Sequence, residues 1–145
     1  MTRPTLLLPA LLALAACGPN RAPQIKIRDG WARATAPGQS TGAAYLMIEN
    51  NGGSADRLVE VKTSRASMAM LHANDSSGGV ARMRVMDGID LPAGGRVELR
   101  PGGSHVMLEG LSAPLAAGDR FDLQLHFARA GHRTMSVMVV APGSR

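Results

Sequence analysis

Four side chains with nitrogen or sulfur donors follow one another at wide intervals along this chain of 145 residues. They are His72, Met83, His105 and Met107, and they form the pattern His-x10-Met-x21-His-x-Met. Imidazole is a borderline ligand and thioether is a soft one, so the set favours copper(I) over zinc, calcium or magnesium. Because all four donors are uncharged when they bind, they suit a monovalent ion better than a divalent one. The pattern therefore predicts a copper(I) site.

Each of these residues, taken singly, also has an ordinary structural explanation. A methionine often fills a gap in a hydrophobic core, and a histidine on a strand is often a surface or hydrogen-bonded residue. The chain has nine methionines and four histidines, so isolated examples carry little information. Two histidines and two methionines in one pattern favour a metal site over four unrelated structural residues.

The remaining chemistry of the chain favours carriage or storage of the ion over catalysis. Blue-copper electron-transfer centres need a cysteine thiolate, and the only cysteine, Cys17, lies far from the four donors in the sequence. No constellation of acid, base and nucleophile stands out either. We therefore expect a protein that is not an enzyme.

Residues 1–17 have the features of a targeting segment. Arg3 lies in a short positive start, and an apolar run over 6–14 follows it. This run is interrupted by Pro9 and is only about half of the ~20 apolar residues that a transmembrane helix needs. A signal peptide is therefore expected here, and a membrane span is not.

The sequence Leu-Ala-Ala-Cys at 14–17 resembles the bacterial lipoprotein box. It predicts cleavage before Cys17 and attachment of lipid to this cysteine, which anchors the protein to a membrane on the periplasmic side. The alternative is an ordinary secretory signal that leaves Cys17 as a spare thiol. Residues 18–24 are rich in Pro, Gly, Asn and Arg, which is typical of a short tether.

The net charge of the chain is +5, and its basic residues are scattered. One Trp, one Tyr and two Phe are too few to provide stacking platforms among basic residues, so nucleic acid is not an expected partner. The charge fits a solvated surface with some attraction to anionic lipid or to an acidic partner.

Residues 25–145 have the pattern of a single all-β domain. About nine short apolar or alternating segments recur at intervals near ten residues, and no segment has a convincing helical period. This favours a β-sandwich or barrel. An Asp29-Gly30 turn signal precedes Trp31, and 114–118 predicts a turn or helical loop. The expected strands lie within 25–27, 44–48, 58–61, 68–72, 80–86, 97–99, 105–107, 121–127 and 135–140.

Strand geometry can bring the four donors together. Side chains two apart on a strand share a face, so His105 and Met107 can approach one ion while Val106 points to the other layer. The turn signal at 76–79 predicts a hairpin across which His72 and Met83 can face each other.

Several segments together are similar to one known family. They include WARATAPG at 31–38, AAY at 43–45, LPAGG at 91–95, VEL at 97–99 and RPGGSHVML at 100–108, besides the short runs around His72, Met83 and Gly110. Over about 25–140 the chain resembles the PCuAC family of periplasmic copper chaperones, and all four donors match its metal motif.

This resemblance implies a cupredoxin-like, Greek-key β-sandwich or barrel that binds one copper(I) in a shallow site. It also implies copper delivery toward the binuclear copper centre of cytochrome c oxidase, with a Sco-type protein as a partner. Three other interpretations stay open: a copper-storing or uptake-linked lipoprotein, a copper-dependent redox enzyme, and a structural β-sandwich lipoprotein without metal.

The chain departs from the usual family pattern at two positions. Met70 stands where many members have an acidic residue, and Ala81 stands where many have a methionine. Because Met70 shares the alternation of His72, an auxiliary ligand role is one hypothesis; the favoured alternative is that Met68 and Met70 both pack in the core.

Two further histidines, His126 and His132, lie outside the metal motif near the C-terminal strands. We expect both to be structural or exposed residues, and a weak second metal site there stays open.

Overall fold

A computed structural model of the protein describes residues 22–145. The predicted signal peptide, the lipid attachment site at Cys17 and residues 18–21 of the tether lie outside the described residues. The described part is all-β, as expected, and contains no helix that could cross a membrane. Its strands are β1 (Ile25–Arg33), β2 (Thr41–Asn50), β3 (Asp56–Lys62), β4 (Ala66–Asp75), β5 (Arg82–Met86), β6 (Ile89–Leu91), β7 (Arg96–Leu99), β8 (His105–Leu111), β9 (Arg120–Phe127) and β10 (Gly131–Val140).

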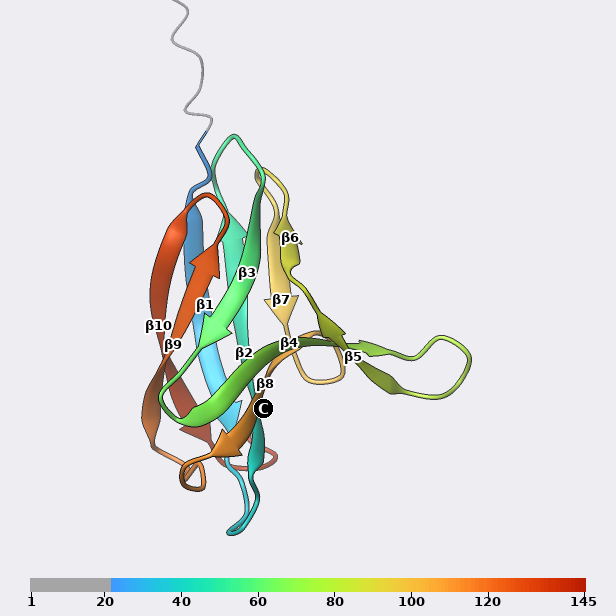
Figure 1. Ribbon diagram of the computed structural model, residues 1–145, viewed down its shortest axis with the longest axis vertical. Helices are drawn as coiled ribbons and strands as arrows, with labels where there is room; N and C mark the ends of the chain where they lie inside the picture. Colours follow the sequence, from blue (N-terminus) through green and yellow to red (C-terminus); the bar gives the residue numbers. More distant parts are fainter. Residues whose placement is uncertain (1–21) are drawn as a thin grey trace, which may run out of the picture.

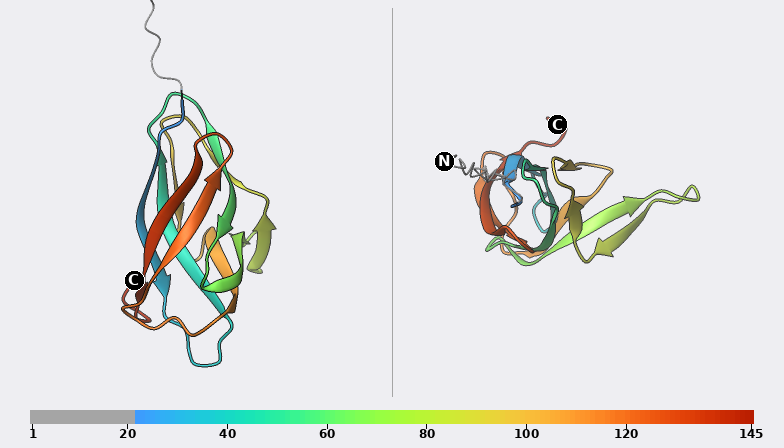
Figure 2. Two further views of the ribbon diagram at one scale, coloured as in Figure 1. Left: turned by 60° about the vertical axis from the view of Figure 1, so that its left-hand side comes forward. Right: turned by 90° about the horizontal axis from the view of Figure 1, so that it is seen from above.

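The strands form one hydrogen-bonded path in the order β5-β4-β8-β2-β1-β10-β9-β3-β6, and β7 pairs with β2. All neighbours are antiparallel except β1 and β10, which run parallel. Seen from above in Figure 2, the strands curl around a common interior. The β4–β5 hairpin extends sideways from this body, as Figure 1 also shows. This arrangement is the cupredoxin-like β-sandwich that the resemblance implied.

The interior is filled by side chains from alternate strand positions. In β9, Phe121, Leu123, Leu125 and Phe127 are buried, while the residues between them face outward. This period of two is what the sequence predicted, because successive side chains of a strand point to opposite faces. Burial of each such side chain contributes about 1.5–3 kcal/mol, so the core can stabilise the domain without a disulfide.

The structure corrects two details of the predicted strands. First, residues 22–145 contain ten strands instead of the nine expected, because β6 was missed: only Ile89 and Leu91 are buried in it, too few to show an alternation. Second, the predicted turn at Asp29 and Gly30 is wrong. β1 continues through this point with a register shift against β2, and Asp29 has a φ of 53°. A β-bulge accommodates such a shift without ending the strand.

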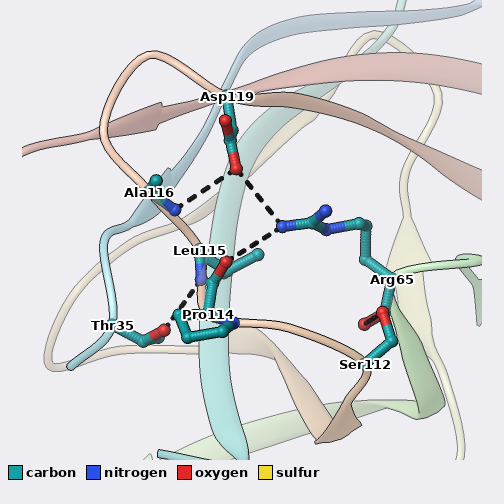
Figure 3. Close-up of polar contacts among 7 residues, drawn as sticks. All are labelled: Thr35, Arg65, Ser112, Pro114, Leu115, Ala116 and Asp119. Carbon is teal, nitrogen blue, oxygen red and sulfur yellow. Dashed lines mark hydrogen bonds and ion pairs between the residues drawn. The ribbon is translucent and has the colours of Figure 1, made fainter. Parts of the chain in front are cut away.

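The loop between β8 and β9 is tied to the body by a small polar network (Figure 3). Nη2 of Arg65 donates to the carbonyl oxygen of Pro114 at 3.1 Å and contacts Oδ2 of Asp119 at 3.3 Å. Leu115 is fully buried, and its backbone N–H donates to Oγ1 of Thr35 at 2.9 Å. In return, the backbone N–H of Thr35 donates to the carbonyl oxygen of Leu115 at 3.0 Å. The segment 114–118 is therefore a braced loop with a turn and no helix.

Candidate metal centre

Two of the predicted donors, His72 on β4 and His105 on β8, are direct partners across an antiparallel pair of strands. Directly paired residues lie on the same face of a sheet, so the two imidazoles are neighbours. Their ring centroids are 5.7 Å apart, and their planes are inclined at 62°. Both residues are more than nine-tenths buried. Residues that are 33 positions apart in the sequence thus form one pair of nitrogen donors.

The hydrogen bonding of the two rings differs. Nδ1 of His105 lies 3.1 Å from the carbonyl oxygen of Gly103, which can only accept; Nδ1 therefore carries the hydrogen, and the lone pair of Nε2 is available. Both ring nitrogens of His72 are buried and have no hydrogen-bond partner within residues 22–145. A buried polar group without a partner costs about 1–3 kcal/mol, so such a group calls for an explanation. Binding of a metal ion by His72 supplies one.

The two sulfur donors lie on the same face as the histidines. Met107 is two residues beyond His105 on β8 and is half-buried. Met83 on β5 pairs with Asn74, which is two residues beyond His72 on β4. The direct partner of His72 on β5 is instead Val85. His72 and Met83 are therefore offset by two residues along the strands and do not lie directly opposite each other as the sequence suggested. The period of two nevertheless leaves Met83 on the shared face.

A surface hollow of about 310 Å³ is bordered by Met83, His105 and Met107. Its opposite wall comes from the end of β1, the loop after it and the start of β2, including the braced Thr35. Arg33 is the only charged residue among those that line the hollow within the described part of the chain. A wall without carboxylates offers little to a hard divalent ion, whereas the neutral nitrogen and sulfur donors suit a soft monovalent one.

Sequence reasoning missed the aromatic side chains that adjoin the site. Tyr45 on β2 lies beside His105, with 6.4 Å between ring centroids, and Trp31 on β1 packs on Tyr45 at 4.5 Å. The pairing of Ala44 with Val106 places Tyr45 next to His105 across the β2–β8 boundary. This neighbourhood depends on a strand pairing that the local sequence pattern does not encode. The buried Tyr45 ring therefore lies against His105, and Trp31 supports it from the other side.

The hairpin that carries Met83 is fixed at its turn by Asp75. The backbone N–H of Ser77 donates to Oδ1 of Asp75 at 2.8 Å. Hydrogen bonds from Ser77, chiefly one from its side chain, hold the pKa of the Asp75 carboxyl below its usual value, and Arg84 adds a smaller electrostatic effect. The ionised carboxylate therefore stabilises the turn at neutral pH.

The other methionines and histidines considered from the sequence differ in burial and in their distance from the four donors. Met68 is 52% exposed, so the expectation that it packs in the core is wrong. Met70 is half-buried and pairs with Met107. His126 and His132 pair across β9 and β10 and stack at a centroid distance of 4.2 Å, away from the four donors. Within 22–145 there is no group of three or more His, Cys, Asp or Glu residues that could hold a metal ion.

Comparison with known proteins places this geometry in a family. The family model described as "Putative lipoprotein LpqE-like" matches residues 25–139. The "Putative lipoprotein Lxx21020" of Leifsonia xyli subsp. xyli is 32% identical over 121 residues, which is 83% of this chain and 72% of that protein.

Two similar solved structures contain copper according to their descriptions. The copper-bound PCuAC domain from PmoF2 is 32% identical and has a TM-score of 0.70, with coverage of 81% of this chain and 93% of the domain. The solution structure of CuI-DR1885 from Deinococcus radiodurans is 28% identical and has a TM-score of 0.60, with coverage of 90% and 84%. The sequence predicted that this protein is not an enzyme, and its similarity to these copper-binding domains agrees with that prediction. The chain belongs to the LpqE-like family and has the fold of its PCuAC domains.

Proposed function

We propose that this protein is a copper(I)-binding metallochaperone whose ion is held by His72, Met83, His105 and Met107. The observation that carries this proposal is the buried His72 ring, whose two nitrogens have no partner in the described part of the chain although the paired ring of His105 lies beside it. Copper bound to structural relatives supports the choice of ion. The two thioethers add soft donors that favour copper(I).

The unequal burial of the donors fits a carrier better than a permanent store. The two histidines are buried, Met107 is half-buried, and Met83 is 60% exposed on the projecting hairpin. A recipient can therefore approach from the side of Met83 and replace this ligand while the histidines still hold the ion. Exchange of one ligand at a time avoids release of free copper(I) between donor and recipient.

The recipient in this proposal is the binuclear copper centre of cytochrome c oxidase, reached directly or through a Sco-type protein. The location is the periplasmic side of a membrane. Support for the location comes from the lipoprotein descriptions of the family and of the Leifsonia relative, together with the lipobox pattern that ends at Cys17. In this proposal residues 1–17 are removed as the signal peptide, the lipid is attached to Cys17, and 18–24 tether the copper-binding domain 25–145.

Titration with copper(I) in the presence of a competing chelator tests the site. Wild-type protein should bind one copper(I), and the double variant His105→Ala/Met107→Ala should lose this binding. The double variant His126→Ala/His132→Ala is the matched control, because it removes two imidazoles from a face away from the site and should leave the affinity unchanged. Wild-type affinity in the His105→Ala/Met107→Ala variant would place the ion elsewhere.

A transfer experiment separates a chaperone from the alternative, a copper-storing or uptake-linked lipoprotein. Copper-loaded protein is mixed with an apo oxidase copper domain or with an apo Sco-type protein, and the two proteins are separated and assayed for copper. A chaperone should give up its ion within minutes at equal concentrations. Retention of copper against both recipients would favour storage.

Fractionation of cells that produce the full chain tests the anchor. Wild-type protein should be found with the membranes, and Cys17→Ser should release it or leave an unprocessed precursor. A soluble periplasmic wild-type protein would identify an ordinary secretory signal instead.

A further inference from the structure

Met70 is adjacent to the histidine pair on the same face of strands β4 and β8. On β4 it precedes His72 by two residues, and on β8 its direct partner is Met107. The pairs His72–His105 and Met70–Met107 are therefore consecutive on one face of the same two strands. Side chains in directly opposite positions have Cβ atoms about 4.5–5.5 Å apart. Met70 is thus placed as close to Met107 as His72 is to His105.

The environment of Met70 leaves its side chain room to move. It is half-buried, and it also borders a hollow of about 160 Å³ that Val59, Val85 and Asp87 help to line. Methionine has three rotatable side-chain bonds and adapts to irregular space at low energetic cost. Its thioether can therefore turn either toward this hollow or toward the histidine pair.

Met83, by contrast, lies on an edge strand of the sheet. β5 is the last strand of the hydrogen-bonded path and, among the strands of the described part, pairs only with β4. The hairpin projects from the body (Figure 1), and Met83 is 60% exposed. Hairpins with few buried contacts open more readily than core strands. Met83 is therefore the donor that leaves the ion most easily.

We propose that Met70 is a fifth donor of the copper(I) site and takes the place of Met83 when the hairpin moves away. The ion then stays on His72, His105 and Met107 with the Met70 thioether. One copper–sulfur bond breaks and another forms, and because thioethers are neutral and carry no proton, neither a proton nor an electron is transferred. This inference rests on the proposed copper(I) site and deepens it, since it explains how a recipient gains access without loss of the ion.

The first test compares the copper(I) affinities of three variants by chelator competition. Leucine replaces methionine with little change in volume, so Met70→Leu, Met83→Leu and the double variant should all fold. Each single variant should bind within about tenfold of wild type because the other thioether substitutes. The affinity of the double variant should fall by about 100-fold or more beyond the product of the two single fold-changes, since exchangeable ligands are not additive. Met68→Leu is the matched control on the same strand and should bind like wild type.

The second test observes the donor directly by NMR of methionine methyl groups. In the Met83→Leu variant, addition of copper(I) should shift the Met70 and Met107 methyl signals, while the Met68 signal stays in place. An unshifted Met70 signal in this variant, or a double variant that binds as tightly as Met83→Leu alone, would overturn the inference. If the histidine variants lose copper in that case, the proposed site stands without Met70. A wild-type protein that binds no copper(I) would overturn both.

Discussion

His72 and His105 lie opposite each other on β4 and β8 with ring centroids 5.7 Å apart, yet only the His105 ring has a hydrogen-bond partner. The ring of His72 is buried with both nitrogens unpaired in the part of the chain that the structure describes. A side chain in this state lowers the stability of the apo protein unless it gains a partner. In the proposed site the ion gives a partner to a polar group that the fold alone leaves without a bond, which would link copper binding to folding.

The link predicts opposite effects of His72→Leu on binding and on stability. Copper(I) affinity should fall by at least about tenfold, or ~1.4 kcal/mol, because a donor is lost. The free energy of unfolding of the apo variant should equal or exceed that of the apo wild type, since a buried imidazole without hydrogen bonds is replaced by an apolar side chain. Urea unfolding of both apo proteins and chelator competition measure the two effects. A variant that is destabilised by more than ~2 kcal/mol would show that the ring has a structural partner.

Copper(I) affinity should depend on pH through the two imidazoles. An imidazole nitrogen must be unprotonated to bind a metal. Protons therefore compete with copper for these nitrogens, and the affinity should fall as the solution becomes more acidic. Chelator competition at a series of pH values measures this, with a correction for protonation of the chelator. A flat profile would argue against histidine ligation, because thioethers do not titrate.

The hairpin turn should weaken only in acid solution. The folded-state pKa of Asp75 is depressed, so its contribution to the turn is present above the ordinary carboxyl pKa and is lost as the pH falls through the lower, folded value. The Ser77 amide should therefore keep this hydrogen bond at the pH where ordinary carboxyl groups titrate, and should lose it only in more acidic solution. NMR titration of Asp75 and of the Ser77 amide checks that the two change together. The Asp75→Asn variant should show no carboxyl titration at this position.

Loss of the Arg65 network should affect stability more than copper binding. Arg65→Met removes the contacts with Pro114 and Asp119 that Figure 3 shows, and we expect a loss of roughly 1–2 kcal/mol in the free energy of unfolding. The side chain is 27% exposed, so solvent screens part of the ion pair with Asp119. Arg96→Met, at an exposed position of β7, is the control and should be nearly neutral. A large loss of copper affinity in Arg65→Met would mean that the loop positions the donors as well.

Local sequence pattern predicted the parts of the fold that depend on single strands. The alternation of Phe121, Leu123, Leu125 and Phe127 identified β9, and the spacing of His105 and Met107 placed both on one face with Val106 in the core. The fold class followed from many such segments together. The cupredoxin-like topology came from the family resemblance, since no local pattern defines which strands are neighbours.

The parts that were wrong depend on pairing between strands. The register of β4 against β5 places Val85 opposite His72, and the offset of Met83 by two residues is set by the hairpin turn. Likewise, the Asp29–Gly30 signal indicated a turn, but parallel pairing with β10 and antiparallel pairing with β2 keep β1 intact around a bulge. Tyr45 could not be recognised as a neighbour of His105 for the same reason. Tertiary pairing overrides such local signals.

The most direct test is a crystal structure of the copper(I)-loaded protein with anomalous data collected at the copper edge. We expect a single strong peak between the rings of His72 and His105, within bonding distance of the Met107 sulfur and of one further thioether. A peak beside His126 and His132, or a loaded protein in which both ring nitrogens of His72 remain without a partner, would contradict it.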